Sequence, residues 1–177
     1  KALRIYGYEL LFRADSDSSG FSGASSTSAT AAVMGGLFEQ GLNGVVGSSK
    51  AFVNFDYDFI MSDMIELIDS TALVIEILET VQVDDRLLER IQSLKKRGYK
   101  VALDDFINDE NSSKMTPCAD IIKFDIRNTP LDMIRKQVKE ALADKKVLLA
   151  EKIETTEEFQ EAKRMGFQLF QGYFFCK

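Results

Sequence analysis

Short apolar runs alternate with amphipathic stretches along this chain, and this alternation constrains the fold more than any other feature. Runs rich in β-branched and aromatic residues favour strands, and apolar residues at helical spacing favour helices. The expected strands are Leu3–Phe12, Lys50–Phe55, Leu73–Leu78, Val101–Asp105, Ile121–Phe124, Val147–Ala150 and Leu169–Phe175. The expected helices are Ser28–Gln40, Phe59–Ile68, Asp84–Arg97, Leu131–Leu142 and a last one from Thr155 or Thr156 to Met165. Such alternation predicts parallel β/α units.

The number of units favours a barrel. About seven strands without a glycine-rich phosphate-binding fingerprint fit a β/α barrel better than a doubly wound sheet. A complete barrel typically needs about 200–250 residues, and this chain has 177. We therefore expect an α/β fold, a TIM-like β/α barrel that is incomplete or has shortened units. Two polar segments, Asp15–Ser28 and the stretch from the end of the fourth strand through Lys114, predict loops.

Composition excludes several classes of function. The chain has no histidine, which rules out Ser-His-Asp and Cys-His catalysis and histidine-bound zinc. A net charge of −6 disfavours DNA as a partner, because nonspecific nucleic-acid binding needs a basic surface. No apolar stretch approaches the roughly 18–20 residues of a membrane span, and no signal peptide opens the chain. Cys118 and Cys176 lie far apart and form no metal-binding motif, so we expect a cytoplasmic protein.

Polar or acidic residues stand at or near the end of most predicted strands. They are Asn54, Glu76, Asp104, Asp105, Lys123, Glu151 and Gln171, and Glu9 lies inside the first strand. Taken singly, each has a structural explanation: Glu76 could neutralise a lysine, Asn54 could cap a helix, and Lys123 could extend to solvent. In a barrel, however, the strand ends converge on one mouth. Carboxylates gathered there repel one another unless divalent cations bind, and such a site suits two-metal hydrolysis of a phosphodiester.

The same residues belong to short motifs that occur in the order of a known family. The motifs are Tyr8-Glu9-Leu10-Leu11-Phe12-Arg13, Asn54, Glu76 to Glu79, Asp104-Asp105-Phe106, Lys123 to Asp125, Ala150-Glu151 to Glu154, and Gln171-Gly172-Tyr173. In these motifs the chain resembles the EAL domain, the family of cyclic di-GMP phosphodiesterases and their degenerate relatives.

The resemblance implies a role for each matching residue. Metal ligands for Mg²⁺ or Mn²⁺ would be Glu9, Asn54, Glu76 and Asp104, with Asp105 on a second metal. Lys123 and Glu151 would flank the attacking water, with Glu151 as the base. Arg13 and Gln171 would lie near the nucleotide, and Glu79 would steady the loop after the aspartate pair. The implied activity is hydrolysis of cyclic di-GMP to the linear dinucleotide, and a homodimer is compatible with the resemblance.

Several residues depart from the family pattern. Ile107 and Lys152 each replace a glycine, Leu10 replaces an alanine, and the loop Ile107–Pro117 is short. This combination is similar to EAL domains fused to an HDOD domain, which implies that residues 1–177 are one EAL-like domain of a longer protein whose C-terminal partner domain is absent. Three readings stay open at this point: a metal-dependent phosphodiesterase, a degenerate domain that senses nucleotide or contacts partner proteins, and an unrelated acidic barrel.

Overall fold

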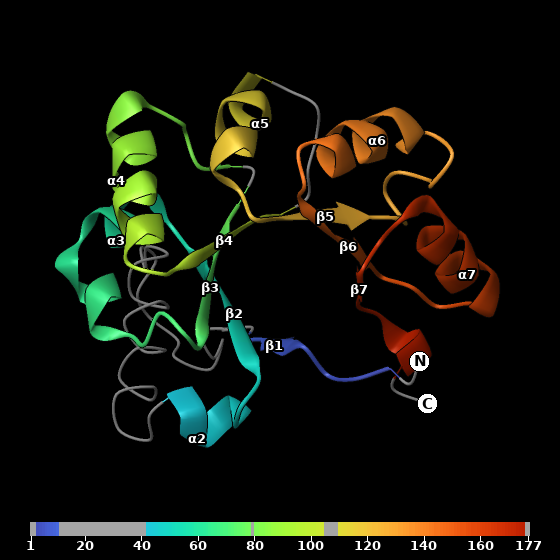
Figure 1. Ribbon diagram of the computed structural model, residues 1–177, viewed down its shortest axis with the longest axis horizontal. Helices are drawn as coiled ribbons and strands as arrows, with labels where there is room; N and C mark the ends of the chain where they lie inside the picture. Colours follow the sequence, from blue (N-terminus) through green and yellow to red (C-terminus); the bar gives the residue numbers. More distant parts are fainter. Residues whose placement is uncertain (1–2, 11–41, 79, 105–109, 176–177) are drawn as a thin grey trace, which may run out of the picture. The chain divides into compact units, whose positions relative to one another are not determined.

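The computed structural model describes residues 3–10, 42–78, 80–104 and 110–175 (Figure 1). They fall into two compact units, one of Lys1–Ile77 with Asp84–Lys100 and one of Leu78–Val83 with Val101–Lys177. The helix predicted at Ser28–Gln40 lies outside the described residues.

The first unit is built on three parallel strands. Its elements are β1 (Gly7–Glu9), α2 (Leu42–Val46), β2 (Lys50–Phe55), α3 (Tyr57–Met61), the 3-10 helix η1 (Asp63–Leu67), β3 (Leu73–Ile77) and α4 (Asp85–Lys96). Strand β2 pairs with β1 on one side and β3 on the other. Alternate residues of β2 face the helices: Phe55 is fully buried and stacks on Phe59 of α3, with ring centroids 4.8 Å apart. The intervening residues of β2 therefore face the opposite side of the sheet.

Helix α4 forms where the sequence predicts it, because both its ends and its apolar stripe are encoded locally. The side chain of Asp84 accepts a hydrogen bond from the backbone N–H of Leu87 at 2.8 Å and caps the first turn. Leu87, Ile91 and Leu94 are fully buried, which follows from their spacing along one face. Gly98, with φ +98°, ends the helix in the left-handed conformation that glycine adopts without strain.

The second unit is built on four parallel strands in the order β4-β5-β6-β7. Its elements are β4 (Lys100–Leu103, whose first residue falls in the first unit), α5 (Glu110–Met115), η2 (Thr116–Cys118), β5 (Ile121–Asp125), α6 (Arg135–Ala143), β6 (Val147–Glu151), α7 (Thr156–Met165), β7 (Leu169–Phe170) and η3 (Tyr173–Phe175). Helix α7 begins with a capping box in which Thr155 and Glu158 bond each other's backbone N–H groups.

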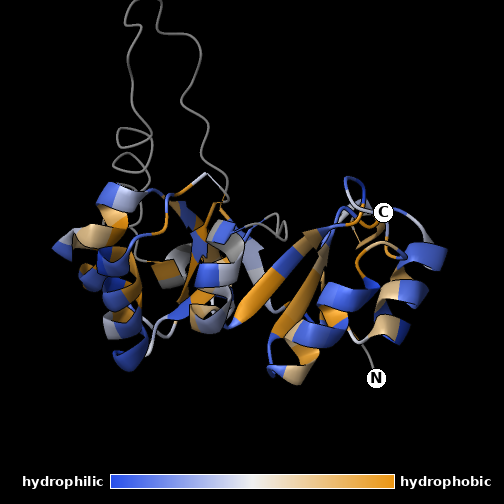
Figure 2. Ribbon diagram, turned by 90° about the horizontal axis from the view of Figure 1, so that it is seen from above, coloured by the Kyte–Doolittle hydropathy of each residue, from blue (hydrophilic) through white to orange (hydrophobic). Residues whose placement is uncertain are grey.

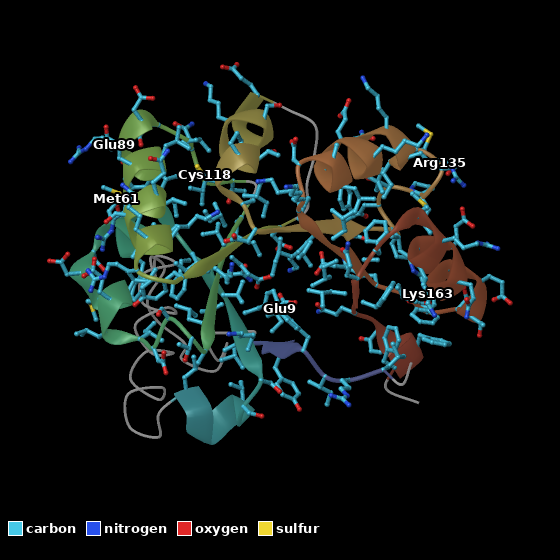
Figure 3. All side chains as sticks on the ribbon, viewed as in Figure 1. Glu9, Met61, Glu89, Cys118, Arg135 and Lys163 are labelled. Carbon is cyan, nitrogen blue, oxygen red and sulfur yellow. The ribbon has the colours of Figure 1, made fainter. Side chains whose placement is uncertain are left out.

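The core of the second unit lies between its strands and helices. Phe124 of β5 is buried and meets the ring of Phe167 edge to face at 5.7 Å. Leu148 and Ala150 of β6 are fully buried, and Val138 and Phe159 contribute from α6 and α7. Figure 2 shows the same pattern in each unit, with largely hydrophobic strands and helices that carry hydrophilic residues on one side. Charged side chains such as Glu89 on α4 point away from the strands (Figure 3).

Some predicted elements are shorter or of another type. The helix expected at Phe59–Ile68 is interrupted at Ser62, whose backbone is extended. The polar segment expected as a loop through Lys114 contains helix α5, in which Lys114 pairs with Glu110 at 2.7 Å. Helix α6 begins at Arg135 instead of at the predicted position of Leu131, after a turn that follows Pro130. Within the described part of the chain, no helix is long and apolar enough to cross a membrane.

Candidate functional site

Three of the predicted metal ligands lie on one face of the first unit. The strand register pairs Glu9 with Phe52 and Asn54 with Glu76. Residues in register on parallel strands share a face, and residues two apart on one strand do so as well. Glu9 (labelled in Figure 3), Asn54 and Glu76 therefore project from the face opposite Phe55 and α3. The strand register thus places these three predicted ligands on one face of the sheet.

The environment of this face suits a hard cation. Glu76 is fully buried, and a buried carboxylate is stable only where positive charge or hydrogen bonds compensate it. The side-chain oxygen Oδ1 of Asn54 is also buried and accepts no hydrogen bond from any described residue. An amide oxygen beside carboxylates is the type of ligand that Mg²⁺, Mn²⁺ and Ca²⁺ prefer. The residues present thus fit the divalent cation that the family uses, although the described residues contain no group of three acidic side chains close enough to hold a metal alone.

In the second unit, a buried lysine joins two carboxylates at the ends of neighbouring strands. The Nζ of Lys123 lies 2.7 Å from Oδ1 of Asp104, which directly follows β4, and 3.0 Å from Oε1 of Glu151 at the end of β6. The Lys123 side chain is only 1% exposed, whereas those of Asp104 and Glu151 are 16% and 9% exposed. The register pairs Lys123 with Leu149, two residues before Glu151, so all point to the face opposite α6 and α7. The arrangement puts a cation between two acids at the carboxyl ends of parallel strands, where such folds bind ligands.

A second ion pair stands beside the first. The Oδ1 of Asp125 accepts hydrogen bonds from the backbone N–H groups of Arg127 at 2.8 Å and Asn128 at 3.2 Å, and Oδ2 pairs with Nζ of Lys152. Burial alone would raise the pKa of Asp125, but the bond from Lys152 and the two N–H groups outweigh it and hold that pKa below its usual range. The sequence marked both residues within motifs but not as partners. The strand period could not have linked them, because it places Lys152 on the face opposite Glu151, and only the left-handed backbone of Lys152 (φ +58°) brings its side chain to Asp125.

Gln171 follows β7 and is fixed through its backbone. Its N–H donates to the carbonyl of Ala150 at 2.9 Å, and its carbonyl accepts from the N–H of Ile153 at 3.0 Å. The next residue, Gly172, packs so tightly that a Cβ there would lie 2.2 Å from the carbonyl oxygen of Ile153. Only glycine fits at this position. Gln171 itself is exposed.

The remaining predicted site residues, Arg13, Glu79 and Asp105, lie outside the described residues.

Comparison with known proteins gives one consistent result. The model of the EAL domain family matches residues 55–177. The cyclic di-GMP phosphodiesterase CdgJ of Vibrio cholerae is 35% identical over 175 residues, which are 97% of this chain and 40% of that protein. The uncharacterised protein YuxH of Bacillus subtilis is 35% identical over 181 residues, with 98% of this chain and 44% of that protein covered. The chain thus spans less than half the length of these curated relatives.

The solved structures bear on the fold. The EAL-domain protein YkuI of Bacillus subtilis, solved in complex with its substrate cyclic di-GMP and calcium, superposes with a TM-score of 0.75 at 23% identity and covers 97% of this chain and 51% of that one. The EAL-domain protein of Listeria monocytogenes gives a TM-score of 0.64 at 20% identity, over 85% of this chain and 68% of that one. The prediction of a TIM-like β/α barrel of the EAL type, incomplete or with shortened units, is confirmed. With its fold, its motifs in order and its sequence relatives in agreement, this chain belongs to the EAL domain family.

Proposed function

We propose that this domain hydrolyses cyclic di-GMP to the linear dinucleotide in a metal-dependent reaction. The observation that carries the proposal is the buried Lys123 held between Asp104 and Glu151 at the strand ends. A carboxylate that can take a proton and a cation that can offset charge on a phosphoryl group are the groups that phosphodiester hydrolysis requires. The sequence similarity to CdgJ, a cyclic di-GMP phosphodiesterase, supports the choice of substrate.

Each group of predicted site residues has a distinct part in this scheme. Glu9, Asn54, Glu76 and Asp104 would hold one Mg²⁺ or Mn²⁺, and Asp105 would contribute to a second. When bound, such a cation lowers the pKa of its water and stabilises charge on the phosphoryl oxygens. Glu151 accepts a proton from the attacking water, and Lys123, 3.0 Å from its Oε1, orients that carboxylate. The water oxygen forms a bond to phosphorus, one P–O bond of the phosphodiester breaks, and the leaving ribose oxygen gains a proton. Arg13 and Gln171 contact the nucleotide, and Glu79 steadies the loop after Asp105.

The working context of the domain is also a proposal. CdgJ and YuxH are longer than this chain, which supports an additional domain in the whole protein, and the motif resemblance favours the HDOD type for it. A cytoplasmic location and a homodimer complete the proposed setting, with cyclic di-GMP as the small-molecule partner.

A second candidate is a domain that binds the nucleotide without turning it over. The observation behind it is Lys152, which replaces the glycine of the family pattern. Its ammonium forms an ion pair with Asp125 beside the proposed base. Such a domain would act as a sensor or as a contact surface for another protein.

One assay separates the two. The protein is incubated with cyclic di-GMP and Mn²⁺, and the linear product is followed by chromatography beside the variant Glu9→Ala. Product from the wild type alone supports the hydrolase, whereas equal background product from both proteins rejects it. Calorimetry with the same nucleotide then distinguishes a sensor, which releases heat, from a protein-contact module, which does not.

A further inference from the structure

Lys152 adopts a backbone conformation that lysine rarely takes. Its φ is +58°, in the left-handed region, directly after the proposed base Glu151. Glycine adopts this conformation without strain, whereas a residue with a Cβ persists there only when its surroundings hold it in place. Lys145, at the end of α6, has the same φ of +58°, but it follows the helix C-cap, where such a turn is common. The turn at Lys152 follows a strand and needs another cause.

The side chain of Lys152 forms an ion pair with the last residue of β5. Its Nζ pairs with Oδ2 of Asp125, a side chain that is only 3% exposed, while the Lys152 side chain is 57% exposed. The other oxygen of Asp125 is fixed by the backbone N–H groups of Arg127 and Asn128. The acceptor is therefore rigid, and an ion pair to a rigid, buried carboxylate is stronger than one between two mobile surface groups.

The next residue, Ile153, forms backbone hydrogen bonds with the segment that follows β7. The N–H of Ile153 donates to the carbonyl of Gln171 at 3.0 Å, and its carbonyl accepts from the N–H of Phe174 at 3.1 Å. Because Gly172 packs tightly against Ile153, the two segments cannot shift relative to each other. Lys152 thus lies between two fixed contacts, one to β5 and one to the turn after β7.

We infer that Lys152 is a positioning residue, whose ion pair with Asp125 locks the β5, β6 and β7 ends together and so holds Glu151 and Gln171 in one arrangement. The part of this inference that concerns catalysis rests on the proposed function. Lys152 touches neither water nor nucleotide in this scheme, and it acts through the groups beside it. Loss of this ion pair, called the tie below, would let Glu151 and Gln171 move independently. Misplacement of a catalytic group lowers kcat more than it weakens binding.

Amide hydrogen exchange tests the tie without requiring activity. The variants are Lys152→Met, which removes the charge, Lys152→Arg, which keeps it, and the matched control Lys145→Met, which changes a lysine of the same φ that forms no ion pair with a described residue. In Lys152→Met we expect the amides of Ile153, Gln171 and Phe174 to exchange roughly 10-fold faster, because local opening then costs less free energy. The same amides should stay within about twofold of wild type in the other two variants. The amide of Val138 on α6, bonded to Ile134 at 2.9 Å, should not change in any of them.

Two exchange results would overturn the inference. One is an unchanged rate at Ile153, Gln171 and Phe174 in Lys152→Met. The other is an equal acceleration at Val138, since that would mean a general loss of stability and no local tie.

Kinetics on the same proteins test the consequence for the reaction. Lys152→Met should lower kcat for cyclic di-GMP by about 10-fold with KM changed less than about threefold, and Lys152→Arg should restore kcat. A rise in KM at constant kcat would overturn the positioning role. Absence of product even from the wild type would overturn the proposed function instead, while the exchange rates would still decide whether the tie exists.

Discussion

Replacing Lys123 with methionine should remove more stability than any surface substitution in this domain. Methionine fills a similar volume but leaves Asp104 and Glu151, which flank the ammonium at 2.7 and 3.0 Å, without the cation between them. Removing one partner of a buried ion pair typically costs about 3–5 kcal/mol. Since both carboxylates keep some contact with water, we expect the lower end, about 3 kcal/mol in metal-free buffer. For a chain of 177 residues this corresponds to a fall in Tm of about 6–12 °C.

Urea denaturation followed by circular dichroism measures this loss directly. Lys139→Met, on an exposed lysine of α6, is the matched control and should change the free energy of unfolding by less than about 0.5 kcal/mol. The double variant Lys123→Met with Glu151→Gln should recover about 1 kcal/mol relative to Lys123→Met alone, because one of the two facing charges is gone. A loss below about 1 kcal/mol in Lys123→Met, or no recovery in the double variant, would refute the view that Lys123 holds the two acids together.

Three further predictions follow from other parts of the site. Gly172→Ala should destabilise the domain by about 1–3 kcal/mol through its clash with Ile153, clearly more than Gly47→Ala, where no described atom beyond the two adjacent residues lies within 4 Å of the added Cβ; equal losses in thermal melts would contradict this. The lowered pKa of Asp125 means that its stabilising contribution is fully present above the ordinary pKa of an aspartate and is lost as the pH falls through the lower pKa of the folded state, so the stability gap between wild type and Asp125→Asn should close in acid, below that ordinary pKa; a gap that widens in acid would have the wrong sign. Mn²⁺ at about 100 times its Kd should stabilise the wild type by about 2.7 kcal/mol, removable with a chelator, and Asn54→Ala should reduce this gain; an identical metal-dependent melting shift in both proteins would exclude Asn54 as a ligand.

The sequence predicts most of the elements that bury a periodic apolar face. Strand β5 and helix α4 appear within a residue of their expected limits, because their burial pattern and caps are local. Helix α5 was not predicted, since its residues Glu110–Met115 carry no apolar stripe and its order depends on packing and on the pair between Glu110 and Lys114. The expected strand at the C-terminal end shrinks to Leu169–Phe170 because Gly172 turns the chain against Ile153.

The sequence predicts which residues form the candidate site but not how they pair. Strand-end positions alone indicated Asn54, Glu76, Lys123 and Glu151, because parallel strands bring their ends to one edge. From the sequence alone, Lys123 could equally have extended to solvent. Its burial between two acids depends on the register of three strands, which the sequence does not display. The partnership of Lys152 with Asp125 likewise depends on a left-handed backbone, and composition gives no sign of it.

The most direct test of the proposed function is the rate at which purified protein converts cyclic di-GMP to its linear product in Mn²⁺, compared with Glu151→Gln. The geometry around Lys123 predicts turnover by the wild type and a loss of about 10²–10⁴-fold in kcat in the variant, because Gln cannot accept the proton of the attacking water. Equal rates in the two proteins, or no product from the wild type in the presence of metal, would contradict the assignment of Glu151 as the base of a working phosphodiesterase.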